Sequence, residues 1–110
     1  MIGTKPLKPS LREKKRYLRF QVKAARKFSF EAVSTSVEAE LQSLIGKLGA
    51  AKAGLTPVAN KWNHSSQEGI FRVNRGYLDH LRATFSLMNS INNTQIIIRS
   101  VKASGMINKA

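Results

Sequence analysis

The side chains best suited to chemistry in this sequence are cations gathered near its start. Residues 9–20 hold five of them and one acid, Glu13. The five are Arg12, Lys14, Lys15, Arg16 and Arg19. Closely spaced ammonium and guanidinium groups repel one another, and a polyanion such as a nucleic-acid backbone relieves that repulsion. The spacing therefore predicts a segment that neutralises phosphates and does not itself make or break bonds.

The charge of the whole chain supports the same prediction. Its 110 residues include 19 Lys and Arg against 6 Asp and Glu, which gives a net charge of +13. Ten of the cations and one of the acids precede residue 28, so +9 of the total lies in the first quarter. Such asymmetry is typical of proteins that bind nucleic acid or another anionic surface.

The composition also excludes some classes of site. The chain has no cysteine, which excludes disulfides and thiolate metal sites and fits a cytoplasmic protein. No apolar run approaches the roughly 20 residues that span a bilayer, so no membrane partner is expected.

The sequence contains no constellation typical of catalysis. His64 and His80 are far apart and lack partners at metal-ligand spacing, and Glu38 and Glu40 would point to different faces of a helix. There is no glycine-rich phosphate loop and no nucleophile elbow. We therefore expect no catalytic residue, no metal site and no cofactor bound by this chain.

Periodicity predicts the elements that position the cations. Apolar and polar residues alternate over residues 16–26, as in a strand with one face in a core. Leu18, Phe20, Val22 and Ala24 would share the core face. Three further strands are predicted at 58–62, 70–74 and 95–102. Pro57 before the first of these favours a sheet edge, and Asn92-Asn93 before the last favours a turn.

Two helices are predicted between the strands. Apolar residues recur at spacings of three and four from Phe30 to Leu48, and we expect this whole stripe to be buried. Ser29 is suited to cap the start of this helix and Gly49 its end. The second helix is predicted over residues 75–90.

The order strand, helix, strand, strand, helix, strand predicts an α+β fold. The expected form is a ferredoxin-like (RRM-like) two-layer sandwich, in which a four-stranded antiparallel sheet carries both helices on one face. A single domain would span residues 9–107, preceded by a flexible basic tail at 1–8 and followed by a short tail at 108–110.

The other face of this sheet is expected to be open. In the strand at 70–74, Phe71 and Val73 would face the core, and Ile70, Arg72 and Asn74 would face away. Cations and apolar side chains would together line the open face: Arg19, Lys23, Arg72, Arg99, Ile70, Ile97 and Val101. With Phe71 expected in the core, base stacking on the sheet is disfavoured relative to phosphate contact by the basic segment.

Four segments together resemble a known family. Residues 9–17, 69–75, 82–87 and 101–107 resemble in kind, order and spacing the archaeal ribonuclease P protein component 2 family. The third strand and helix entry, Gly69-Ile70-Phe71-Arg72-Val73-Asn74-Arg75, is the most specific when it is combined with the first segment. Met106 departs from the pattern, because a small hydroxyl residue is expected there.

The resemblance implies a protein subunit of ribonuclease P, the endoribonuclease that removes the 5′ leader of precursor tRNA. The RNA subunit would perform the hydrolysis with magnesium, and this chain would support it without catalytic residues of its own. The implied partners are the ribonuclease P RNA, a TIM-barrel-like ribonuclease P protein and, indirectly, precursor tRNA. Self-association within a heterotetramer is also implied.

Carried over by position, the family motif marks a set of RNA contacts. With Arg19 beside them, these are Arg12, Lys14, Lys15, Arg16, Arg72 and Arg75. For Arg72 the alternative is a solvent-facing strand residue without a partner. For Arg82, in the third segment, we expect a structural salt bridge and not an RNA contact.

Two other functions stay open at this point. A ribosomal or other RNA-scaffold protein has the same composition and often the same fold. A protein-interaction module without direct RNA binding would use the open face as its main site. A stand-alone nuclease is disfavoured, because no catalytic constellation is present.

Overall fold

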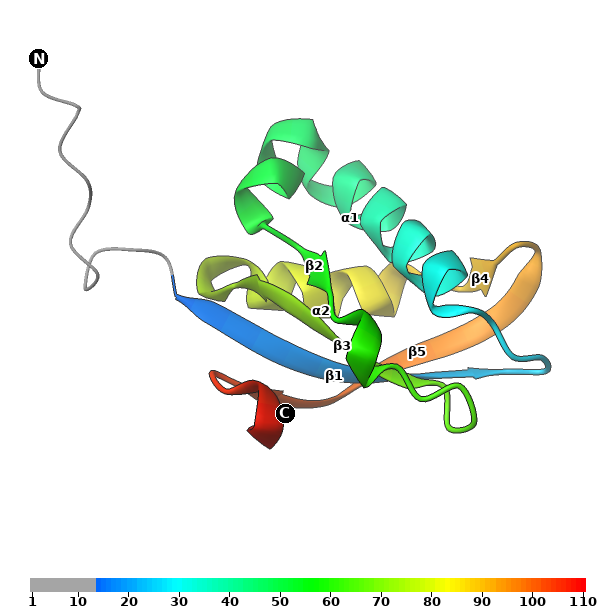
Figure 1. Ribbon diagram of the computed structural model, residues 1–110. Coiled ribbons are helices and arrows are strands. Elements are labelled where there is room, and N and C mark those ends of the chain that lie inside the picture. Colours follow the sequence, from blue (N-terminus) through cyan, green and yellow to red (C-terminus); the bar gives the residue numbers. More distant parts are fainter. Residues whose placement is uncertain (1–13) are drawn as a thin grey trace, which may run out of the picture.

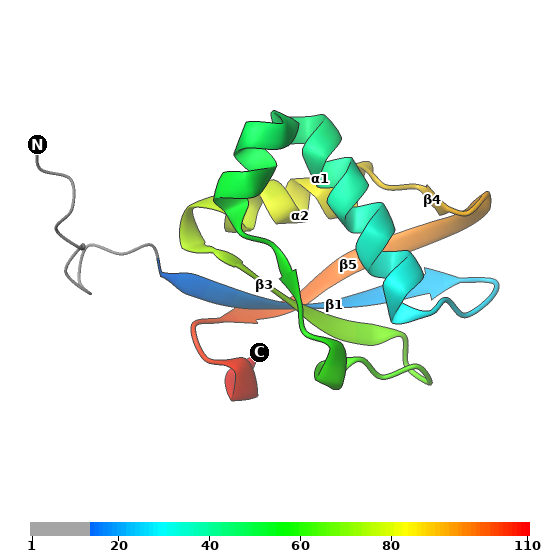
Figure 2. The ribbon, with the colours of Figure 1, turned by 45° about the horizontal axis from the view of Figure 1, so that its top comes forward.

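The computed structural model describes residues 14–110 and has two layers (Figure 1). One layer is an antiparallel sheet with the strand order β2-β3-β1-β5-β4, and both helices cover the same face of it (Figures 1 and 2). The strands are β1 (Lys15–Ala24), β2 (Thr56–Pro57), β3 (Glu68–Asn74), β4 (Ser90–Ile91) and β5 (Thr94–Ser104). The helices are α1 (Phe30–Ala53) and α2 (Leu78–Leu87), with short 3₁₀ helices η2 (Ala59–Lys61), η3 (Arg75–Tyr77) and η4 (Ile107–Lys109).

The predicted α+β class is confirmed, but the sheet has five strands where four were expected. The additional strand is β4, which is only two residues long and therefore shows no periodicity. Asn92 and Asn93 join it to β5 with φ angles of 49° and 65°. Two left-handed residues in a row are what the tightest hairpin turns need, and asparagine tolerates that conformation. The predicted turn is thus confirmed.

Strand β1 lies in the middle of the sheet and sets the core. Its alternation is confirmed, because Leu18 and Phe20 are fully buried and Val22 nearly so, although Ala24 is exposed. The Phe20 ring stacks on Phe71 of β3, with 4.9 Å between the ring centroids. This buried face packs against the helices, so the side chains between these positions belong to the opposite face.

Helix α1 begins as predicted and ends later. The Ser29 hydroxyl accepts a hydrogen bond from the Ala32 amide at 3.1 Å, which confirms the N-cap. The predicted cap at Gly49 is wrong, because the helix continues to Ala53 and ends at Gly54 with φ 62°. Instead, Gly46 interrupts it with φ 78° and ψ 171°.

The break at Gly46 also changes the buried stripe of α1. Val33, Val37 and Leu41 are buried as expected. Leu44 is 40% exposed and Leu48 is 70% exposed, so the prediction that the whole stripe is buried is wrong at its end. Leu48 lies beyond the kink, where the chain takes a new direction and a 3.6-residue period counted from Phe30 no longer follows the core side. Leu44 precedes Gly46, so the kink does not account for its exposure.

The predicted strand at 58–62 is also wrong. The ladder with β3 ends at Pro57, and Val58 N–H donates one more hydrogen bond to the Ile70 carbonyl at 3.0 Å. The chain then turns into η2. Beyond η2, a single bridge joins Asn63 to Glu68 of β3. The placement of Pro57 on an edge strand is confirmed, since β2 is the outermost strand on its side.

The second helix is shorter than the predicted 75–90. Residues 75–77 form η3, and the α-helix spans only Leu78–Leu87. Met88 has already left helical geometry, with ψ 129°, but it is still buried.

We call the sheet face away from the helices the open face. Ile70 pairs directly with Arg19 across β1 and β3, which places it on this face, yet its side chain is fully buried. The 3₁₀ helix η4 lies on this side of the sheet (Figures 1 and 2). Ala59 and Asn60 of η2 line a pocket there together with Ile107. The expectation of a wholly open face is therefore wrong, because short segments cover part of it.

Candidate nucleic-acid interface

Four of the predicted RNA contacts lie together at the N-terminal end of β1. Lys14, Lys15 and Arg16 enter the strand there, and Arg75 follows the end of the neighbouring β3. The Arg75 amide donates to the Lys14 carbonyl at 2.7 Å, which fixes the two backbones side by side. We call Lys14, Lys15, Arg16 and Arg75 the proximal cluster. Arg12 lies outside the residues that the structure describes.

No ion pair within residues 14–110 neutralises the charges of the proximal cluster. Residues 14–110 contain two ion pairs, Arg19–Glu68 at 3.6 Å and Arg82–Asp79 at 3.3 Å, and neither includes a member of the cluster. Lys15 Nζ donates instead to the neutral amide oxygen of Asn74. Neutral acceptors leave the net charge of the cluster intact, so an incoming anion would meet its full field.

A single amide side chain links this cluster to the helix layer. Besides accepting from Lys15, Asn74 donates through Nδ2 to the Lys52 carbonyl at 2.6 Å, near the end of α1. One side chain thus joins the start of β1, the end of β3 and the end of α1. The cluster is held by the fold even though Lys14 and Lys15 are exposed.

Arg19 lies farther along β1 and already has partners within the chain. Besides its ion pair with Glu68, its Nε donates to the Ala110 carbonyl at 3.0 Å. It lies four residues beyond Lys15, roughly 13 Å along a strand. The structure therefore does not bring Arg19 into the proximal cluster. The salt bridge expected for Arg82 is confirmed by its contact with Asp79.

Arg72 lies directly opposite Tyr17 on the open face and is half-buried. Its Nε is buried and has no hydrogen-bond partner among the described residues. A pocket of about 430 Å³ adjoins it, with Tyr17 and Ile107 among its lining residues. These contacts do not decide between an RNA contact and a solvent-facing strand residue for Arg72, so its role in RNA binding stays a prediction.

The sequence did not predict that Lys102 lies on the open face with Arg19 and Arg72. Counting alternately along 95–102 places Lys102 on the face opposite to Ile97 and Arg99. A bulge shifts the register, so that Arg19 pairs with Lys102 whereas Phe20 pairs with Ser100. The extra residue, Val101, returns Lys102 to the open face. Arg99, which was expected on this face, donates to Gln21 Oε1 at 2.9 and 3.2 Å.

Charge is divided between the two layers. Helices α1 and α2 carry four acidic and three basic side chains. The rest of residues 14–110 carries thirteen basic side chains and a single acid, Glu68, which pairs with Arg19. The sheet and its loops are therefore strongly positive, and the helix layer is nearly neutral.

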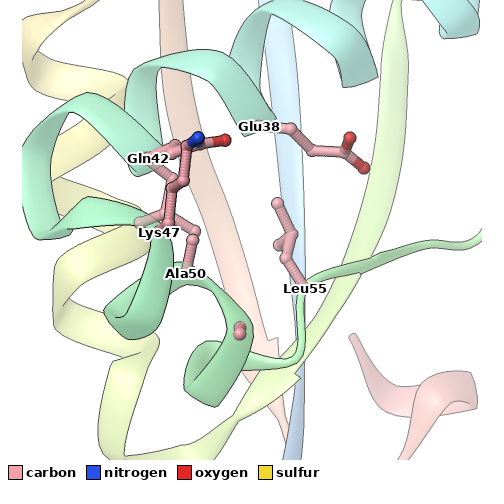
Figure 3. Close-up of a pocket in the computed structure, with 7 residues that line it drawn as sticks. Glu38, Gln42, Lys47, Ala50 and Leu55 are labelled. Carbon is pink, nitrogen blue, oxygen red and sulfur yellow. The ribbon is translucent and has the colours of Figure 1, made fainter.

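The kink of α1 borders a pocket of different character. About 480 Å³ in volume, it is lined by both halves of α1 and by Leu55. In Figure 3 the Glu38 carboxylate points away from the Lys47 side chain, and no second acid lines the pocket. A lone carboxylate cannot form the acid–base pair of a hydrolase. Nothing here indicates catalysis.

Residues 14–110 also lack two other kinds of feature. Within residues 14–110, no group of three or more His, Asp or Glu side chains is placed to hold a metal ion. None of the helices there is long and apolar enough to cross a bilayer.

Comparison with known proteins adds to this geometry. Residues 16–110 match the model of the Rpp14/Pop5 family. The chain is similar to ribonuclease P protein component 2 of Thermococcus kodakarensis, with 36% identity over 96% of this chain and 86% of that protein. The protein of the same name from Archaeoglobus fulgidus is 31% identical over 96% of this chain and 92% of its own length.

A solved structure has a similar fold. One chain of the cryo-EM structure of yeast ribonuclease MRP aligns with a TM-score of 0.65. The alignment covers 84% of this chain and 75% of the yeast chain, at 11% sequence identity. At that identity the likeness concerns the fold alone.

Proposed function

This chain belongs to the Rpp14/Pop5 family, and we propose that it is a protein subunit of ribonuclease P that binds the phosphate backbone of the catalytic RNA. The observation that carries the proposal is similarity along nearly the whole chain to archaeal proteins named ribonuclease P protein component 2. The uncompensated cations at one end of the sheet support the RNA contact.

In this proposal the chain acts by electrostatics and not by bond chemistry. A folded RNA brings phosphates close together, and their repulsion opposes the compact form. Exposed cations held by backbone pairing lower that cost and release counterions. The proximal cluster fits this role, because no ion pair among residues 14–110 offsets its charge and its backbone is fixed by the Arg75–Lys14 hydrogen bond. Hydrolysis, with magnesium, would belong to the RNA subunit.

The remaining partners are part of the same proposal. A TIM-barrel-like ribonuclease P protein would bind this chain to form a heterodimer, and two heterodimers would associate into a heterotetramer. Precursor tRNA would be contacted indirectly. The complex would work in the cytoplasm. We also propose that α1, α2 and the four strands β2-β3-β1-β5 correspond to the ferredoxin-like arrangement, with β4 as an addition at the edge.

The test is the salt dependence of RNA binding. A triple variant Lys14→Ala, Lys15→Ala, Arg75→Ala should reduce the slope of log affinity against log salt by about one unit per lost phosphate contact. The matched control is Lys47→Ala, Lys52→Ala, Arg82→Ala, which removes two lysines and one arginine from the helix layer. Equal effects in the two variants would refute a specific proximal contact.

Cleavage of precursor tRNA by the reconstituted holoenzyme gives the second readout. The proximal variant should need more magnesium for full activity, and the control should behave as the wild type. Binding that barely changes with salt would favour the protein-interaction module instead. Ribosomal RNA among the nucleic acids that co-purify would favour the scaffold protein.

A further inference from the structure

Three more cations lie at the other end of β1. Lys23, Arg26 and Lys27 are all exposed, and we call them the distal cluster. They occupy the end of β1 and the loop that leads to α1, at the opposite end of the strand from the proximal cluster (Figure 1). Lys15 and Lys23 are eight residues apart on one strand, roughly 26 Å. The family motif did not mark this cluster.

The loop that carries the distal cluster is held in a fixed shape. Phe28 is buried, and its backbone N–H donates to Gln67 Oε1 at 2.9 Å. Gln67 Nε2 donates in return to the Phe28 carbonyl at 3.2 Å and to the His64 carbonyl at 2.9 Å. A buried side chain therefore replaces the backbone pairing that the loop lacks.

The buried Phe28 in turn positions Arg26. Its guanidinium lies over the Phe28 ring, 4.5 Å from the ring centroid, and its Nε donates to Thr94 Oγ1 at 3.0 Å. Both contacts are with neutral groups, so they orient the cation without cancelling its charge. A cation ordered in advance costs less entropy when an anion binds.

The charge around the distal cluster is also uncompensated. No ion pair within residues 14–110 includes any of its three members. Along the sequence the nearest acid is Glu31, in the first turn of α1, where a negative charge suits the positive end of that helix. Glu68 of β3 lies opposite Gln21 and pairs with Arg19. On the strand side, Lys23 lies opposite the exposed Ile97 of β5, which carries no charge.

We infer that the distal cluster is a second RNA-backbone site, which binds phosphates other than those held by the proximal cluster. This inference rests on the proposed function, since it takes RNA as the partner. The separation of roughly 26 Å between the two clusters is several times the size of a single phosphate group. The two clusters therefore cannot share one phosphate group, and each holds its own stretch of backbone.

The observations favour RNA over an acidic protein at this site. Protein interfaces are anchored by large aromatic side chains in desolvated pockets. The aromatic residue of this loop, Phe28, is buried beneath Arg26 and is not available as an anchor. What the loop presents outward is charge, which suits a phosphate backbone.

The first experiment compares three variants on the ribonuclease P RNA. Lys23→Ala, Arg26→Ala, Lys27→Ala should lower the salt slope by about two to three units, as the proximal variant does. The control Lys47→Ala, Lys52→Ala, Arg82→Ala removes the same charge and should leave the slope unchanged. A distal variant that behaves like the control, while the proximal variant loses slope, would overturn this inference and leave the proposed function standing.

The second experiment maps where each cluster binds. Hydroxyl-radical footprinting of the RNA should show that the distal variant loses protection at nucleotides that the proximal variant still protects. Loss of the same nucleotides in both variants would contradict a separate site. Should the wild-type chain give no footprint at all, the proposed function would fall as well.

A double variant distinguishes a loss of RNA contacts from a loss of the folded structure. Lys23→Ala, Lys27→Ala keeps Arg26 with its Phe28 and Thr94 contacts, so its unfolding midpoint should be no lower than that of the wild type. It should still lose about one to two units of salt slope. A normal slope in this folded variant would refute the roles of both lysines.

Discussion

Gln67 shows how a single side chain can determine the position of charged neighbours. It is buried, has a φ of 55°, and makes hydrogen bonds to both backbone groups of Phe28. A left-handed glutamine is uncommon and costs conformational energy, which the hydrogen bonds offset. The residue holds the β1–α1 loop, so its effect extends to cations that it does not touch.

We expect Gln67→Leu to lower the free energy of unfolding by about 2–4 kcal/mol, because two buried backbone groups of Phe28 lose their partners. Urea denaturation measures this loss. The matched control Gln95→Leu alters an exposed residue of β5 and should change the unfolding free energy by less than about 0.5 kcal/mol. Equal stability of the two variants would mean that the Phe28 bonds contribute little.

At the same scale, sequence reasoning placed some side chains well and others poorly. It named Lys14, Lys15, Arg16 and Arg75 as RNA contacts, and the fold brings them together although Arg75 is distant in the chain. Their binding of RNA stays a prediction. It could not find the tie between Arg19 and Glu68, because that ion pair depends on the exact register of β1 on β3. Pairing register follows from tertiary packing, which no local pattern encodes.

Among the elements, α1 depends most on one position. Gly46 adopts φ 78° and ψ 171°, a region that is essentially closed to residues with a Cβ atom. A Cβ built at Gly46 would meet nothing within 4 Å, so the backbone angle alone restricts this site. The kink is therefore encoded by the glycine and not imposed by crowding.

Gly46→Ala should destabilise the fold by about 1–3 kcal/mol, because alanine cannot take the kinked conformation without strain. Thermal unfolding would measure the change. In a regular helix the same substitution stabilises by about 0.5–1 kcal/mol, so the sign of the effect separates a kinked α1 from a straight one. Ser43→Ala, three residues earlier on the exposed side of α1, serves as the control and should be nearly neutral.

The elements also show what periodicity can and cannot predict. The ten residues of β1 and the first three turns of α1 were predictable, since a long repeat averages over local exceptions. Short or irregular elements were not. The two-residue β4, the 3₁₀ helix η2 and the bulge opposite Arg19 are each too brief to leave a pattern. The bulge is what moves Lys102 to the open face.

For the whole molecule, the dominant property is uncompensated positive charge. The net charge is +13, and residues 14–110 contain only two ion pairs. Mutual repulsion among these cations destabilises the folded state, and dissolved salt screens repulsion between exposed charges.

Stability should therefore rise with salt. Between about 0.05 and 0.5 M NaCl we expect a gain on the order of 1 kcal/mol, or roughly 4–8 °C in the unfolding midpoint. Differential scanning calorimetry would measure it. The distal variant should show a smaller gain than the helix-layer control, since only the former removes charge from the crowded side. A midpoint that falls as salt is added would show that attractive pairs dominate instead.

The unequal charge of the two layers has a consequence for how the molecule would approach RNA. A molecule that is positive on one side and nearly neutral on the other carries a dipole moment. An anionic surface would therefore orient it before contact. In physiological salt this orienting field acts over roughly 8 Å. The strands would arrive first and α1 would be left facing the solvent. Its kink, with the exposed Leu48 beside it, would then stay reachable after docking. A later subunit could join on that side without displacing the nucleic acid.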